Sequence, residues 1–443
     1  MGRGDDLDIE LIAVPGPRGA PVTSPRMLWL FAAAMATSLA IAAFGGLVLG
    51  ILAATGRGIA RSRWTEIVQA HGGLQLWGWV AVFVTALSFE FIVRFNQEGP
   101  FSFRSRVSIL GLLGAGALLS ATGQVLGHLD RQLAIAGSGL VLAGSVGFIW
   151  LILRIRLQRP RVDLNTFYFR AGAAWLVLAA TATLVSSAHM ESGIVPLEET
   201  RFWVEVFIRG FVMNVTIAVA LHAFPGHLEL PPVKSRPQWI IFVALNASVV
   251  VWAAGTGGFG LAGIDLLQHA GDLAFAGTLL FATAAFGIPR SMRFLGKSSE
   301  RYQVMVPLAW VGLLAYVLGL AIQAVTGENL TLYETGAVRH MFLLGFMAPL
   351  MIAMAHIVLA HFGIGRVLWQ KSLTGAFFLM VVAWPLRVVP PLIDRNVGAV
   401  TEGLMGLAGT LAAFGLALAA VVAAANAWAI AHPQKAQRRE AGS

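Results

Sequence analysis

The chain has 443 residues, of which 57% are hydrophobic and only 12% are charged, far below the roughly 25% of charged residues in a soluble domain. This composition excludes a water-soluble fold. Because the sequence has no cysteine, disulfides, thiolate metal sites, iron–sulfur clusters and cysteine nucleophiles are excluded, and any metal must be held by His, Met or carboxylates. The net charge of +9 comes from basic residues between apolar runs, which indicates contact with membrane lipid headgroups and no binding of nucleic acid.

Twelve apolar runs are long enough to cross a bilayer, since a helical span needs about 20 such residues. The runs lie at 27–55, 65–95, 106–127, 132–156, 167–188, 200–223, 238–256, 262–288, 304–326, 335–360, 370–392 and 402–430. We therefore predict an all-α, polytopic membrane helix bundle of about 12 transmembrane helices. Pro385, Pro390 and Pro391 in the eleventh run favour a kink or an early end.

The predicted membrane domain occupies residues 27–430, between an N-terminal tail (1–26) and a C-terminal tail (431–443). Even-numbered loops and the two tails carry most of the Lys and Arg residues. The positive-inside rule then places both tails in the cytoplasm. We expect a multi-pass protein of a bacterial inner membrane.

Histidines are the most informative polar residues of the predicted spans. Ionisable groups within a membrane are costly, so each is a functional candidate. Five fall at the outer side of the predicted bundle: His71, His128, His189, His269 and His340. Imidazoles at one depth on different helices are what a haem or copper site in a helical bundle requires. We predict these five as metal ligands, with His71, His269 and His340 holding a cofactor, although a histidine at a helix end can also simply reach the interface.

Two arginines are candidate contacts for an anionic group. Arg209 lies four residues after Glu205, a spacing that pairs the two on one helical face. Arg209 is therefore either structural or a contact of a haem propionate or a substrate. Arg339 directly precedes His340 and is predicted to meet a haem propionate or a lipid phosphate.

The eighth run carries Asp265, His269 and Asp272 on one helical face. A carboxylate that accepts the second imidazole N–H would orient His269 at a metal. Asp and His residues within a span also form proton relays. A proton-coupled secondary transporter that uses these residues and Arg209 is therefore the alternative function, and an assembly role is a third.

Three segments resemble the NnrS family. The segment AHGGLQLWGWVAVFVTALSFEFIVRF is similar to the family's His-x-His-Glu helix, and also to the second-helix His-Gly segment of haem–copper oxidase subunit I. His71 matches the first histidine, whereas Gly73 and Leu74 replace the second histidine and the acidic residue. The segment LLQHAGDLAFAGTLLF resembles the family's Leu-His-x-Gly helix at His269. The segment VRHMFLLGFMAPLMIAMAHIVLAHFGIGR is similar to its His-x-x-x-x-Gly helix at His340.

This resemblance implies a bundle related to haem–copper oxidases that binds haem, expected to be b-type, with copper as a candidate second metal. It further implies a role in nitric oxide response, nitrosative stress or respiratory electron handling, with nitric oxide or a respiratory protein as partner. A terminal oxidase is disfavoured, because that pattern needs a His-x-x-x-Tyr pair and an adjacent His-His pair. The seventh run has no histidine, and no tyrosine lies four residues after one. Whether the protein is an enzyme is left open.

Overall fold

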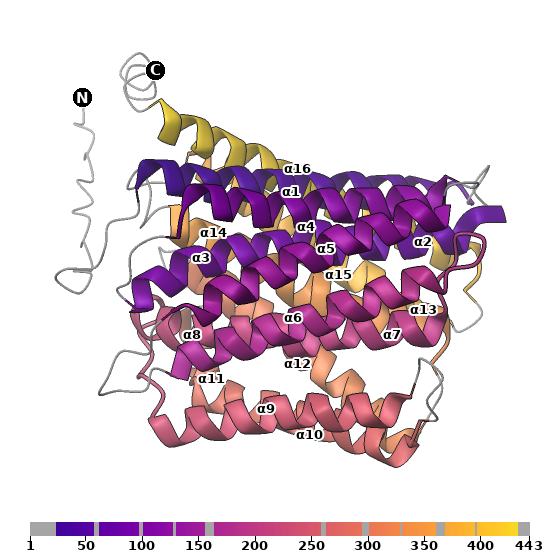
Figure 1. Cartoon of the computed structure of the whole chain (residues 1–443). Helices are drawn as coiled ribbons and strands as arrows, with labels where there is room; N and C mark the ends of the chain where they lie inside the picture. The colour runs from indigo at the N-terminus through magenta and orange to yellow at the C-terminus, as the bar shows by residue number, and fades with distance from the viewer. Residues whose placement is uncertain are drawn as a thin grey trace, which may run out of the picture.

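The computed structural model describes residues 24–56, 62–96, 101–126, 130–155, 164–257, 263–294, 301–327, 330–359, 368–394 and 397–432. The predicted all-helical architecture is confirmed, since each of the 12 apolar runs forms a helix (Figure 1). The elements are α1 (Pro25–Ala54), α2 (Trp64–Gly73), η2 (Leu74–Ala81), α3 (Val82–Asn96), α4 (Phe103–Val125), α5 (Asp130–Leu153), α6 (Leu164–Ala188), α7 (Leu197–Glu205), η3 (Val206–Val212), α8 (Met213–His227), α9 (Ser235–Thr256), α10 (Asp265–Ala285), α11 (Ile288–Ser291), η4 (Met292–Phe294), α12 (Arg301–Thr326), α13 (Leu332–Phe342), η5 (Leu343–Met347), α14 (Ala348–Leu359), α15 (Gln370–Ile393) and α16 (Ala399–Ala431). Most of the predicted tails lie outside the described residues.

Eleven helical segments in the described part of the chain are long and apolar enough to cross a membrane. The helix of the remaining run, the eighth, is α10. It has 21 residues but is less apolar, because it carries Asp265, His269 and Asp272. It packs along α9 at the edge of the bundle (Figure 1). The prolines of α15 do not end that helix early, since it continues to Ile393.

Three continuous spans form the centre of the bundle. The most apolar window of each is almost completely buried: 100% in 64–92, 100% in 197–227 and 94% in 333–359, against 33–56% in the other spans. Each central span also contains a short π-helical stretch, namely η2, η3 and η5. Such stretches are rare and occur mostly at functional sites. The central spans are therefore the strongest candidates to carry a functional site.

Small residues allow the surrounding helices to approach closely, as the high glycine content indicates. A Cβ on Gly116 of α4 would lie 2.6 Å from the backbone oxygen of Gly137 on α5. A Cβ on Gly312 of α12 would overlap the backbone oxygen of Gly345 in η5. Any larger residue at these crossings would force the helices apart.

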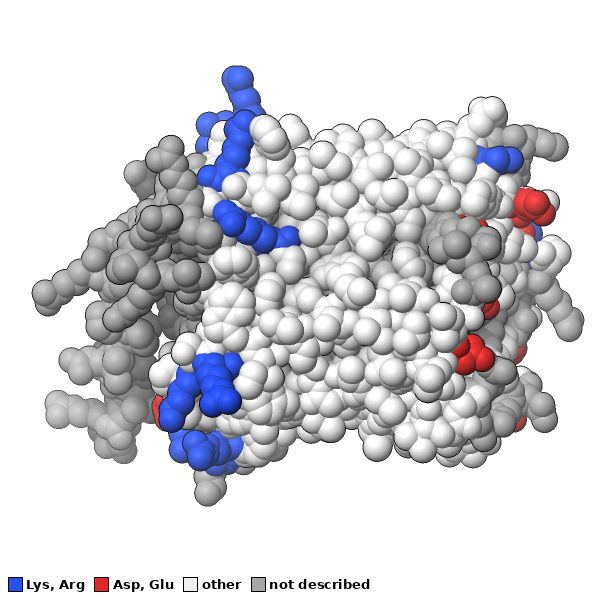
Figure 2. All heavy atoms as spheres, turned by 60° about the horizontal axis from the view of Figure 1, so that its bottom comes forward, with Lys and Arg blue, Asp and Glu red and all other residues white. Residues whose placement is uncertain are grey.

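The two ends of the bundle differ in charge. Lys and Arg side chains gather at the end where α1 begins and α16 ends, and Asp and Glu lie at the opposite end (Figure 2). We call these the termini end and the far end. Glu90 of α3 is buried in an ion pair with Arg106 of α4, so its carboxylate is not free to begin a proton path.

Candidate cofactor-binding site

A large cavity opens between the central spans and the helices α1, α15 and α16 in the half of the bundle nearer the far end. It offers about 260 Å³ to the centres of water molecules, close to the lower end of the roughly 300–1,000 Å³ typical of small-molecule sites. Most of its surface is apolar, with walls from Trp79, Trp203 and Leu416. The polar groups that line it include His71, His340, Arg339 and Arg387.

His71 lies on α2, three residues before the π-helical stretch η2 begins. Its Nδ1 faces α1, where the Cβ position of Gly45 is 3.6 Å away. Gly72 and Gly73, which follow His71, border open space, because a Cβ on either would meet no atom within 4 Å. The α2 backbone therefore leaves room beside the imidazole for a flat group.

His340 lies at the corresponding place on α13, three residues before η5 begins. A capping box of Thr331 and Glu334 fixes the start of this helix. Nδ1 of His340 is 2.6 Å from the carbonyl oxygen of Gly336, to which it donates its proton. That hydrogen bond holds the imidazole in the tautomer with a free lone pair on Nε2, the arrangement of a metal-ligating histidine.

Arg387 of α15 is a cavity-lining cation that the sequence analysis missed. Its guanidinium lies beside Gly336, and Nη1 donates a hydrogen bond of 3.1 Å to the thioether sulfur of Met405. No carboxylate lies within ion-pair distance of it among the described residues. A weak sulfur acceptor leaves most of its hydrogen-bonding capacity unused. The position of Arg387 inside an apolar run indicated a functional residue. The sequence did not show which helices its side chain faces.

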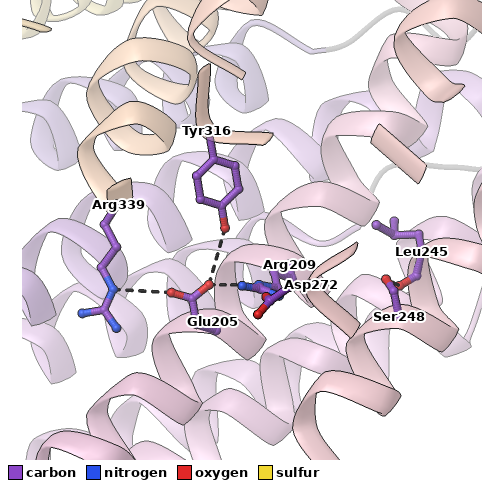
Figure 3. A network of polar contacts seen from close by, with 7 residues as sticks. All are labelled: Glu205, Arg209, Leu245, Ser248, Asp272, Tyr316 and Arg339. Carbon is purple, nitrogen blue, oxygen red and sulfur yellow. Dashed lines mark hydrogen bonds and ion pairs between the residues drawn. The ribbon is translucent and has the colours of Figure 1, made fainter. Parts of the chain in front are cut away.

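Arg339 connects the cavity to a buried ion-pair network (Figure 3). Its Nε lies 3.4 Å from Oε1 of Glu205, and Oε2 of the same carboxylate is 3.0 Å from Nε of Arg209. Arg209 also pairs with Asp272 of α10, and the Tyr316 hydroxyl donates to Glu205 at 3.5 Å. The predicted pairing of Glu205 with Arg209 is confirmed. Two arginines and two carboxylates balance, which lowers the cost of burying all four.

The network also corrects the proposed relation between Asp272 and His269. Asp272 binds Arg209 of the central span, so it is not available to orient an imidazole on its own helix. Arg209 further lies over the rings of Trp252 and Phe275, at 4.8 and 5.1 Å from their centroids. Arg209 is thus enclosed by protein groups and does not line the cavity.

The structure brings together only part of the predicted ligand set. His71, His340 and Arg339 line one cavity, whereas His269 lies beside Gly327 at the periphery. His189, half of whose side chain is exposed, binds Glu199 at 2.8 Å. The remaining predicted ligand, His128, lies outside the described residues. Within the described part of the chain, no group of three or more His, Cys, Asp or Glu side chains could hold a metal ion.

No protein-family model matches the chain, and no curated protein matches its sequence. Among solved structures, the chain is similar to a haem–copper terminal oxidase dimer determined by cryo-electron microscopy, with a TM-score of 0.72 over 92% of this chain and 84% of that chain. The chain has a haem–copper-oxidase-like fold. At 12% sequence identity the match concerns the fold alone, so the NnrS resemblance stays a prediction.

Proposed function

We propose that this protein is a haem-binding membrane protein that holds one b-type haem between His71 and His340. The observation that carries the proposal is the pair of imidazoles on two central spans, both directed at one large cavity, with the His340 Nδ1 proton committed to Gly336. Within the described residues, no hydrogen bond occupies Nε2 of either ring. Bound haem would supply one-electron redox chemistry. The fold of the similar oxidase supports the proposal without deciding it.

Arg339 and Arg387 are suited to hold the two propionates of the haem. Guanidinium groups bind carboxylates through paired, charge-assisted hydrogen bonds. Arg387 lacks a carboxylate partner in the described residues, and Arg339 lines the cavity while its Nε pairs with Glu205. The apolar walls would keep water from the macrocycle, while these two cations meet its charged edge.

His71 and His340 would both be engaged in holding the haem, which would supply one-electron redox chemistry, so the arrangement favours electron transfer over turnover of a substrate. The sequence resemblance implies a role in nitric oxide response or with a respiratory partner. The first role would require nitric oxide to take the place of His71 or His340. The second would require a partner protein that exchanges electrons with the haem. The basic termini end (Figure 2) supports a cytoplasmic location for both tails in a bacterial inner membrane. The cavity would then lie toward the outer side.

The test is a reduced-minus-oxidised visible spectrum of the purified protein in detergent, with iron analysis of the same sample. We expect a Soret band with one iron per chain, lost in His71→Ala and in His340→Ala. His269→Ala and His189→Ala serve as matched controls, because neither residue lines the cavity, and both should keep the band.

A colourless protein that stays metal-free after haem supplementation would overturn the proposal and make the proton-coupled transporter the leading function. Loss of the band in His269→Ala, with His71→Ala unaffected, would show that the ligand assignment is wrong. Titration of the haem protein with nitric oxide then tests the finer role, since a shift of the Soret band at stoichiometric nitric oxide is expected only if the gas displaces a histidine.

A further inference from the structure

A second, smaller pocket lies against the haem cavity, and 8 of its 15 lining residues are polar. It is enclosed by α2, α4, α5, α6 and α7. Its polar lining is Gln69, Ser120, Gln124, Ser138, Thr183, Ser186, Ser187 and Thr200. Gathering hydroxyl and amide groups in the interior of a membrane bundle is costly unless each finds a hydrogen-bond partner.

Several of these groups are satisfied within the protein. The amide of Gln69 forms two hydrogen bonds with the backbone of Val195, at 2.8 and 2.9 Å. The hydroxyls of Ser138 and Ser187 are 2.8 Å apart, and Thr183 donates to the carbonyl oxygen of Ala179. These bonds fix the walls of the pocket.

Three polar atoms of the lining have no hydrogen-bond partner among the described residues. They are Nε1 of Trp77, Oγ of Ser186 and Oγ1 of Thr200, and each is buried. An unsatisfied buried donor or hydroxyl costs about 1–3 kcal/mol. One donor and two hydroxyls around a shared space are a set that water molecules can bridge.

The pocket has room for such waters. It offers about 30 Å³ to the centres of water molecules, and one buried water needs roughly 10–15 Å³ on the same measure. Two waters therefore fit, and the three unsatisfied atoms of Trp77, Ser186 and Thr200 and the surrounding hydroxyls can be their hydrogen-bond partners.

The position of the pocket connects the far end of the bundle with the haem cavity. The two spaces share four lining residues, namely Gln69, Gly73, Thr200 and Trp203. At the far end, Thr200 follows Glu199, whose Oε1 lies 2.8 Å from Nδ1 of the half-exposed His189. The other carboxylate oxygen, Oε2, is buried and has no hydrogen-bond partner in the part of the chain that the structure describes. We propose that the pocket holds two water molecules and forms a polar route by which water and protons pass from the far end to the cavity.

The test uses radiolytic labelling by bound water, which modifies side chains next to an activated water and needs no haem. The full-length protein is irradiated in detergent and modification of each tryptophan is read by mass spectrometry. Trp77 should be modified several-fold faster than Trp310, an equally buried indole whose Nε1 donates to Thr283. After rapid mixing with ¹⁸O-labelled water, the oxygen incorporated at Trp77 should carry the label at the shortest mixing times.

Ser186→Ala and Thr200→Val each remove one orphaned hydroxyl and should reduce the Trp77 modification rate. Thr181→Val is the matched control on α6, because its hydroxyl is exposed and bonds only to the carbonyl oxygen of Val177. Equal modification of Trp77 and Trp310 would show a dry pocket and overturn the proposal. Strong modification of Trp77 with slow ¹⁸O uptake would show sealed waters and overturn the route. Neither result depends on haem, so failure here is distinct from failure of the proposed function.

Discussion

Removing Arg209 should destabilise the protein strongly, because its guanidinium binds two carboxylates inside the bundle. The side chains of Arg209 and Asp272 are only 3% and 4% exposed. In Arg209→Met, Asp272 would be left as a buried carboxylate with no cation, a situation that costs about 3–5 kcal/mol. Glu205 would be less affected, since it keeps Arg339 at 3.4 Å.

The assay is equilibrium unfolding in mixed detergent micelles, followed by circular dichroism, on Arg209→Met and on the double variant Arg209→Met/Asp272→Asn. The double variant should lose less stability than the single one, because it removes the stranded charge. Arg293→Met is the surface control: its pair with Glu229 is 56% and 65% exposed, so the loss should be below about 1 kcal/mol. A single variant as stable as the surface control, or a double variant less stable than the single one, would refute the reasoning.

Three further predictions concern packing and charge. Gly271→Ala should destabilise the packing of α9 on α10 by about 1–3 kcal/mol, because its Cβ would lie 2.5 Å from the backbone nitrogen of Trp252. Thermal melting checks this. The control is Gly277→Ala on the same helix, where a Cβ meets nothing within 4 Å, and it should be neutral or stabilising. Glu90→Gln should lower the melting temperature, since it leaves the guanidinium of Arg106 buried without a counter-charge. In the haem-loaded protein, Arg387→Gln should lower the midpoint potential in a redox titration, because a nearby positive charge favours the reduced haem; an unchanged potential would place Arg387 away from the cofactor.

The sequence predicted the helices well because membrane spans depend on a local property, the length of an apolar run. All 12 runs became helices, within a few residues of their predicted bounds. His71 and His340 could also be singled out, since an imidazole inside a span is conspicuous. Which histidines share a cavity could not be predicted, because that depends on how helices distant in sequence pack together.

The charged residues show the same limit. The pairing of Glu205 with Arg209 was predictable, as it needs only the pitch of one helix. The partners of Asp272 and Glu90, which are Arg209 and Arg106, come from other helices and were not predictable. Arg387 was overlooked for the same reason: 47 residues separate it from His340 in the chain, although both line one cavity.

The π-helical stretches determine how far the two halves of each central span are rotated relative to one another about the helix axis. A π turn adds one residue to an α-helix and so rotates everything beyond it by about 100°. In the span that contains η5 (Leu343–Met347), the extra residue lets His340 face the cavity while α14 presents its own apolar face to the core. Deleting one residue of this stretch would keep the span helical yet turn the imidazole away from its cavity. The orientation of His340 therefore depends on the number of residues in this span, and the loss of one residue there would disturb the cavity as much as the replacement of a side chain.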